Sequence, residues 1–168
     1  MKIFLTGVPG TGKTTIVEQL SKEGSHAKDI DAFSSWIKKR GGKAVINEGK
    51  PNKGFTDEHD WICDIQKLKE FMNQTEDTAI IAGAPTNLKE VLGLFDEVIV
   101  LQCSPEILIH RLNTRPDEFN DFGKDKETQD FILNTYKNFE KEMLEHGAVP
   151  VNADQPFKRV LKEVKLHL

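Results

Sequence analysis

The eight residues 7–14, Gly-Val-Pro-Gly-Thr-Gly-Lys-Thr, constrain this chain more than any other feature. They match G-x-x-x-x-G-K-[ST], the phosphate-binding loop. In such a loop, successive backbone N–H groups surround a triphosphate, and glycines keep side chains away from it. Lys13 is expected to reach the β- and γ-phosphates, and the hydroxyl of Thr14 is expected to ligate Mg²⁺.

The residues on either side of the loop support the same prediction. Residues 2–6 have the pattern of a short buried strand, and residues 15–22 that of a helix that ends near Gly24. The helix would add its positive N-terminal end to the phosphate site. The alternative is a glycine-rich turn that happens to contain a lysine. We predict that ATP and Mg²⁺ bind at this loop, with nucleotide contacts from Gly10, Thr11, Gly12, Lys13, Thr14 and Thr15.

Length, charge and cysteine content narrow the class of protein. With 168 residues, the chain is expected to form one domain, 1–168, and its net charge of −4 argues against a broad nucleic-acid or membrane surface. No apolar run reaches membrane-spanning length, and the early strand leaves no room for a signal peptide. Cys63 and Cys103 form no C-x-x-C pair, which predicts reduced, mostly buried thiols in a cytoplasmic protein. The oligomeric state stays open.

Strand and helix patterns alternate along the chain. Five strands separated by helices predict an α/β fold with a parallel sheet and helices on both faces. Ligands are then expected across the carboxyl ends of the strands. Strands are predicted at 2–6, 27–30, 78–82, 98–101 and 149–151, helices at 15–22, 32–40, 61–71, 88–94, 105–112, 125–146 and 157–166, and polar loops at 41–55 and 113–124.

The carboxylate that a metal beside the loop requires is expected at the end of the second strand. That strand ends in Asp29-Ile30-Asp31, whereas the strand at 78–82 is followed by no acid. Residues two apart in an extended segment point to the same side, so both carboxylates could face the phosphates. One could hold Mg²⁺ through water while the other accepts a proton from an acceptor hydroxyl, and the sequence leaves open which does which. We assign Asp29 to Mg²⁺ together with Thr14, and Asp31 to the proton. The alternative is that Asp31 caps the helix expected at 32–40.

Taken together, these residues resemble the small P-loop kinases of the shikimate kinase and adenylate kinase type. The resemblance covers nearly the whole chain. It implies a three-layer P-loop fold with a five-stranded parallel sheet of order 2-3-1-4-5, an acceptor-binding insertion at 32–74 and a lid at 113–124. It also implies an ATP-dependent phosphotransferase that acts on a hydroxyl or a phosphate of a small molecule.

The resemblance implies roles for several further residues. Asp29-Ile30-Asp31 looks like the D-x-D of shikimate kinases, and Gly83 stands where that family places a glycine beside the acceptor. Arg111 would stack on adenine or touch phosphate. Arg115 would flank the lid and act in catalysis with Lys13 and Asp31, and Pro156 would belong to a loop that closes over the adenine.

The acceptor side departs from this family pattern. The chain has four arginines, and Thr86 occupies the position where adenylate-type kinases place an arginine for the acceptor phosphate. The helix at 125–146 also lacks the arginine with which shikimate kinases hold a carboxylate. Arginine is the preferred bidentate partner of both groups, so the acceptor stays open.

Two other classes of function are alternatives to a small-molecule kinase. An ATPase that acts on a macromolecular partner is the main alternative, because few arginines are available for an acceptor. A regulatory GTPase requires an N-K-x-D motif, and Asn52-Lys53-Gly54-Phe55 lacks its aspartate. Trp36 and Trp61 lie in the acceptor region, where they could stack on a ring or pack in the core.

Overall fold

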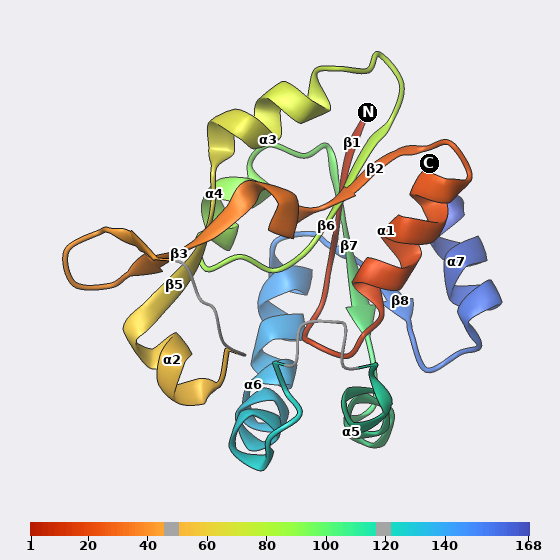
Figure 1. Cartoon of the computed structure of the whole chain (residues 1–168). Helices are drawn as coiled ribbons and strands as arrows, with labels where there is room; N and C mark the ends of the chain where they lie inside the picture. Colours follow the sequence, from red (N-terminus) through yellow and green to blue (C-terminus); the bar gives the residue numbers. More distant parts are fainter. Residues whose placement is uncertain (46–50, 117–121) are drawn as a thin grey trace.

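A computed structural model describes residues 1–45, 51–116 and 122–168, and its centre is a parallel five-stranded sheet (Figure 1). The strand order is β2-β6-β1-β7-β8. Counted along the chain as strands of this sheet alone, that order is 2-3-1-4-5, so the predicted topology is confirmed. The strands are β1 (Lys2–Thr6), β2 (His26–Asp29), β6 (Ala79–Ala82), β7 (Glu97–Gln102) and β8 (Val149–Asn152).

Helices cover both faces of the sheet, as the strand alternation requires. In β1, Ile3 and Leu5 belong to one apolar cluster, whereas Phe4 between them belongs to another. The first cluster includes residues of α1 (Lys13–Lys22) and α7 (Phe157–Lys165), and the second residues of α3 (Ile65–Met72) and α4 (Leu88–Leu92). The three layers are visible in Figure 1, which confirms the predicted three-layer arrangement.

The long helix α6 (Lys126–Glu145) begins one residue later than predicted. Asp125 caps it, because its carboxylate accepts a hydrogen bond from the backbone N–H of Thr128 at 2.8 Å. The helix predicted at 105–112 is also present, as α5 (Pro105–Thr114). Among the residues that the structure describes, no helix combines the length and apolar character needed to cross a membrane.

The helix predicted at 32–40 is wrong. The chain makes a 3-10 turn, η1 (Ile30–Phe33), and then enters a strand, β3 (Ser34–Lys38). This strand pairs antiparallel with β4 (Ala44–Val45) and β5 (His59–Cys63), so that Trp36 lies opposite Trp61. Aromatic and β-branched side chains favour such a pleated surface when a partner strand is present, and the partner here comes from a distant segment.

The helix predicted at 61–71 is correct only in its second half. Its first residues form β5, and Asp64 then caps α3 by accepting hydrogen bonds from the N–H groups of Gln66 and Lys67. The loop predicted at 41–55 contains β4 and the start of a short helix, α2 (Lys53–Glu58), while residues 46–50 lie outside the described residues. The 61–71 prediction failed because the apolar residues of β5 and α3, taken together, have the spacing of a single helical face.

Gly83, at the end of β6, allows η1 to pack directly against the main sheet. A Cβ atom at this position would lie 2.1 Å from Cγ2 of Ile30. The Gly83 carbonyl accepts a hydrogen bond from the buried hydroxyl of Thr6 at 2.8 Å. The glycine therefore brings the Asp29–Asp31 segment close to the end of β1, where the phosphate-binding loop begins.

Both cysteines are free and buried, and we expect them to resist modification in the folded protein. Burial raises the pKa of Cys63 to about 11 and that of Cys103 to about 12. At pH 8 only about one thiol in a thousand, or fewer, would be the reactive thiolate. Titration with Ellman's reagent should show two thiols after denaturation and slow labelling before it. Fast native labelling of either thiol would contradict the burial seen here.

Candidate active site

The phosphate-binding loop connects β1 to α1, and its shape depends on glycine. Gly10 and Gly12 have φ values of 93° and 95°, which L side chains rarely adopt. At Gly7, a Cβ atom would lie 2.8 Å from the hydroxyl oxygen of Thr11 and 2.9 Å from the carbonyl oxygen of Leu101. A hydrogen bond within the loop stabilises this shape, because the Thr11 hydroxyl donates to the Val8 carbonyl at 2.9 Å.

Lys13 lies at the centre of the site. Its amino group donates hydrogen bonds to the carbonyl oxygens of Gly7 at 2.6 Å and Val8 at 3.1 Å. Burial of this group is the main reason that the pKa of Lys13 is lowered to about 8. The carboxylates of Asp29 and Asp31 oppose that shift, whereas the positive charge of Arg115 adds to it. Lys13 therefore interacts electrostatically with Asp29, Asp31 and Arg115, three of the residues predicted to act beside it.

The two residues assigned to the metal are in contact. The Thr14 hydroxyl donates to Oδ2 of Asp29 at 2.8 Å, which joins α1 to the end of β2. Oδ1 of Asp29 accepts a hydrogen bond from the backbone N–H of Asp31 at 3.0 Å. A hydroxyl and a carboxylate are oxygen donors of the kind that Mg²⁺ prefers. Over the described residues, no cluster of three or more histidine, cysteine, aspartate or glutamate side chains could hold a metal.

Asp31 is available for chemistry because Asp29, not Asp31, caps the element that follows. Oδ1 of Asp31 accepts a hydrogen bond from the indole N–H of Trp61 at 2.9 Å. The residue is exposed overall, but protein atoms crowd its carboxyl group and raise its pKa. The Asp29 carboxylate raises this pKa further, while the Trp61 hydrogen bond and Lys13 lower it. The alternative that Asp31 is a helix cap is wrong, because the N-cap of η1 is Asp29.

Arg111 joins three parts of the chain. Its guanidinium donates to the carbonyl oxygens of Ala153 at 2.7 Å and Thr11 at 3.3 Å. The phosphate-binding loop is thus tied to α5 and to the segment after β8. Pro156 follows Ala153 by three residues and precedes α7 as its N-cap. Arg111 therefore lies against the phosphate-binding loop, and the adenine contacts expected of Arg111 and Pro156 stay predictions.

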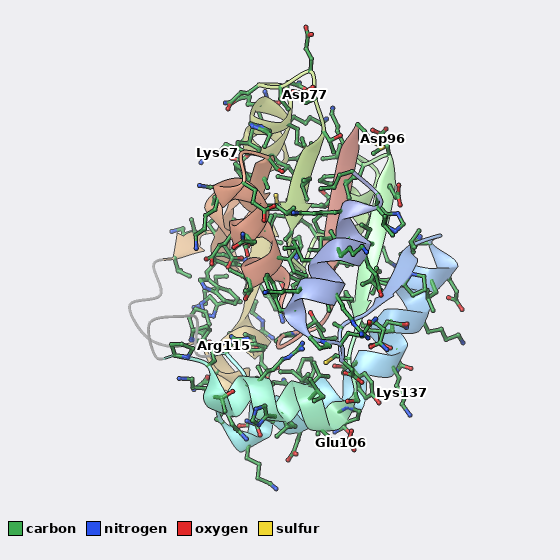
Figure 2. All side chains as sticks on the ribbon, turned by 90° about the vertical axis from the view of Figure 1, so that its right-hand side faces the viewer. Lys67, Asp77, Asp96, Glu106, Arg115 and Lys137 are labelled. Carbon is green, nitrogen blue, oxygen red and sulfur yellow. The ribbon has the colours of Figure 1, made fainter. Side chains whose placement is uncertain are left out.

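Arg115 follows α5 at the start of the predicted lid, and it is half-buried. Figure 2 places it at the opposite end of the molecule from Asp77 and Asp96. Gln129 holds the two ends of the predicted lid, 113–124, together by donating to Oδ1 of Asn113 at 2.7 Å and to the carbonyl of Gly123 at 2.9 Å. Residues 117–121 of the predicted lid lie outside the described residues.

The contacts of Trp61 and Thr86 were not predicted from the sequence. The backbone N–H of Trp61 donates to the Thr86 hydroxyl at 3.0 Å, and the backbone N–H of Thr86 donates to the Trp61 carbonyl at 2.7 Å. The side-chain amide of Asn87 makes a similar pair of hydrogen bonds with the backbone of Cys63. The signal that could have indicated this was the polar pair Thr86-Asn87 directly after the Gly-Ala-Pro turn.

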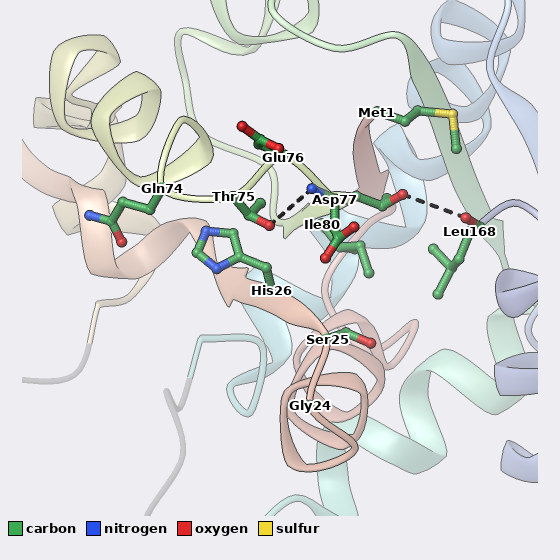
Figure 3. A pocket seen from close by; sticks show the side chains of 11 residues that line it. Met1, Gly24, Ser25, His26, Gln74, Thr75, Glu76, Asp77, Ile80 and Leu168 are labelled. Atoms are coloured by element: carbon green, nitrogen blue, oxygen red, sulfur yellow. Dashed lines mark hydrogen bonds between the residues drawn. The ribbon is translucent and has the colours of Figure 1, made fainter.

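A cavity of about 630 Å³ lies away from this site, near the amino ends of β2 and β6 (Figure 3). His26, Gln74, Asp77 and Leu168 are among the residues that line it. Ligands of open parallel sheets bind at the carboxyl ends of the strands, which is the opposite edge. The cavity is therefore separate from the phosphate-binding site.

Comparison with known proteins agrees with this geometry. A protein-family profile described as “AAA domain” matches residues 3–132, most of the chain. The chain belongs to this AAA domain family. Among curated proteins, one from Methanocaldococcus jannaschii is 31% identical over 122 residues, which are 68% of this chain and 59% of that protein. One from Halobacterium salinarum is 29% identical over 119 residues, or 70% and 60% of the two chains.

Both relatives are named “Putative adenylate kinase”. The present chain spans only 59–60% of their lengths. Among solved structures, shikimate kinase from Bacteroides thetaiotaomicron has a TM-score of 0.55 at 20% identity, over 100% of this chain and 99% of that one. Deoxyadenosine kinase from M. mycoides has a TM-score of 0.57 at 18% identity, over 100% of both chains. The fold is that of small P-loop kinases.

Proposed function

We propose that the chain is an ATP-dependent phosphotransferase that moves the γ-phosphate of ATP to a hydroxyl of a small molecule. The placement of Asp31 carries this proposal, because its carboxylate interacts electrostatically with Lys13 and is not used in capping a helix. A P-loop with a second carboxylate beside it has the groups needed to hold a triphosphate and to accept a proton. The names of the curated relatives and of the structural neighbours support the same class of reaction.

In the proposed reaction, the acceptor hydroxyl oxygen attacks the γ-phosphorus, and the bond from that phosphorus to the bridging oxygen of ADP breaks. Asp31 accepts the hydroxyl proton. Thr14 and Asp29 would hold Mg²⁺, which when bound neutralises charge on the phosphates. Gly10, Thr11, Gly12, Lys13 and Thr15 would bind the phosphates, with Arg111 and Pro156 on the adenine side and Arg115 near the transferring group.

A cytoplasmic location belongs to the proposal, and the two free, buried cysteines support it. The acceptor region is the insertion at 32–74, which holds the small antiparallel sheet. A hydroxyl compound is favoured over a phosphate as acceptor, because Asp31 could receive its proton and Thr86 replaces the phosphate-binding arginine of adenylate-type kinases.

Turnover of Mg·ATP with and without a panel of nucleosides, sugars and phosphorylated metabolites tests the proposed function. We expect at least one compound to increase ADP formation. The amount of its phosphorylated product should equal the amount of additional ADP. Hydrolysis that rises only with a macromolecular partner, with no phosphorylated small molecule, would support the ATPase alternative instead.

Replacing Arg115 with alanine should lower the rate of phosphoryl transfer more than it weakens ATP binding. The reason is that a cation near the transferring group acts most strongly in the transition state, once water is excluded. We expect a fall in kcat of on the order of tenfold or more, with a smaller change in KM for ATP. Steady-state kinetics give both constants.

Lys137→Ala provides the control, because it removes an exposed cation from α6. Hydrogen exchange across 113–124, with and without a non-hydrolysable ATP analogue, tests the lid directly. We expect slower exchange with the analogue. Equal exchange in both states, together with normal turnover of Arg115→Ala, would mean that the segment is only a solvated loop.

A further inference from the structure

The indole of Trp61 contacts the carboxylate that the proposed function uses as a base. Its Nε1–H donates to Oδ1 of Asp31 at 2.9 Å, and the two residues lie 30 positions apart in the chain. We propose that Trp61 is a positioning residue that fixes the orientation of the Asp31 carboxylate, and that Thr86 in turn holds Trp61 in place. This inference rests on the proposed function, in which Asp31 receives the acceptor proton.

The chemistry of the indole makes this contact directional. An indole N–H can only donate, whereas an ionised carboxylate can only accept. The indole therefore uses Oδ1 of Asp31 only as a hydrogen-bond acceptor, and it takes no proton from the carboxyl group. It also restricts rotation of the carboxyl group, which is otherwise a broad torsion in aspartate. One oxygen is thereby committed to Trp61, and the other is left to meet the acceptor hydroxyl.

The ring of Trp61 packs against that of Trp36, which is itself in contact with Phe55. On β3, Trp36 lies directly opposite Trp61, and the two ring centroids are 4.8 Å apart. Trp36 also meets the ring of Phe55 edge-on, with centroids 5.0 Å apart at an interplanar angle of 88°. Aromatic pairs in such tilted and edge-on arrangements restrict one another's movement. The indole therefore has a defined position on the small sheet.

The backbone of Trp61 is fixed to the main sheet by Thr86. The Thr86 hydroxyl accepts from the N–H of Trp61 at 3.0 Å, and the Thr86 N–H donates to the carbonyl of Trp61 at 2.7 Å. Thr86 belongs to the turn that follows β6, the neighbour of β2 in the sheet. Asp31 lies in η1, two residues after the end of β2, so Trp61 connects the turn after β6 to Asp31: its backbone bonds Thr86 and its indole bonds Asp31.

Nuclear magnetic resonance of the indole N–H groups tests the contact without any acceptor. The chain has two tryptophans, so Trp36→Phe assigns the two indole signals. We expect the Trp61 signal to move upfield and its hydrogen exchange to accelerate in Asp31→Asn, because the neutral amide accepts a weaker hydrogen bond than the carboxylate. An indole signal that does not respond to Asp31→Asn would overturn the inference.

Kinetics with Mg·ATP alone, with water as the phosphoryl acceptor, test the positioning role. Trp61→Phe keeps an aromatic ring but loses the donor, and it should lower kcat on the order of tenfold with KM for ATP changed less than about twofold. Trp36→Phe removes an indole from the same pair without removing a bond to Asp31, so kcat should fall less. Thr86→Val should give a fall of about threefold and shift the Trp61 indole signal.

A double variant separates positioning from general loss of structure. If Trp61 acts through Asp31, then Trp61→Phe should cause no further fall in kcat when it is added to Asp31→Asn. Additive effects, or a normal kcat in Trp61→Phe, would overturn the inference and leave the proposed function standing. A normal kcat in Asp31→Asn would instead contradict the proposed base, while the indole signals still report whether the contact exists.

Discussion

Replacing Lys13 with alanine is expected to lower phosphoryl transfer by on the order of a hundredfold or more. Lys13 is the cation of the phosphate-binding loop, and its amino group is held by the carbonyl oxygens of Gly7 and Val8. In the proposed function, it would exchange these neutral partners for phosphate oxygens in a site with little water, where a charge interacts strongly. Single-turnover measurements with Mg·ATP would give the rate directly.

Lys22→Ala is the matched control for this substitution. Lys22 is an exposed lysine in the last turn of the same helix, α1, far from the loop that precedes the helix. It should leave the rate unchanged, and thermal unfolding should show that both variants are folded. Unchanged turnover in a folded Lys13→Ala protein would exclude the predicted nucleotide site.

Replacing Asp31 with asparagine should leave ATP binding nearly intact and abolish transfer. The amide has the size of the carboxylate and can still accept the Trp61 hydrogen bond, but it cannot take up a proton. General-base catalysis contributes on the order of a hundredfold or more, and this is the fall that we expect in kcat. Calorimetric titration with ATP and steady-state turnover measure binding and transfer separately.

Two further variants make the Asp31 experiment specific. Asp29→Asn should weaken the dependence of turnover on Mg²⁺, because Asp29 contacts Thr14 at the proposed metal position. Asp77→Asn changes an exposed aspartate before β6, at the other end of the sheet, and should have no effect. If Asp29→Asn and Asp31→Asn both keep wild-type rates, the two carboxylates are only structural and the metal ligand lies elsewhere.

The local features of the main sheet were predictable from the sequence. The strand, loop and helix around 2–22 follow from short patterns: a buried apolar run, glycines where the backbone needs positive φ, and a helical apolar face. The Asp29-Ile30-Asp31 segment was likewise found beside the loop, because it ends a strand whose neighbours the family resemblance implied. Such features depend on residues within a few positions of one another.

The tertiary structure decided the acceptor side. β3 and β5 are strands because they pair with each other across more than 20 residues, and neither segment carries a local pattern that reveals this partnership. The same holds for the bond between Trp61 and Asp31, and for Arg111, whose guanidinium contacts the distant carbonyl of Ala153. Cross-strand pairing depends on which distant segments meet, so local periodicity could not distinguish these strands from helices. The sequence by itself therefore determined the phosphate site, and only the folded chain determined how Asp31 is held beside it.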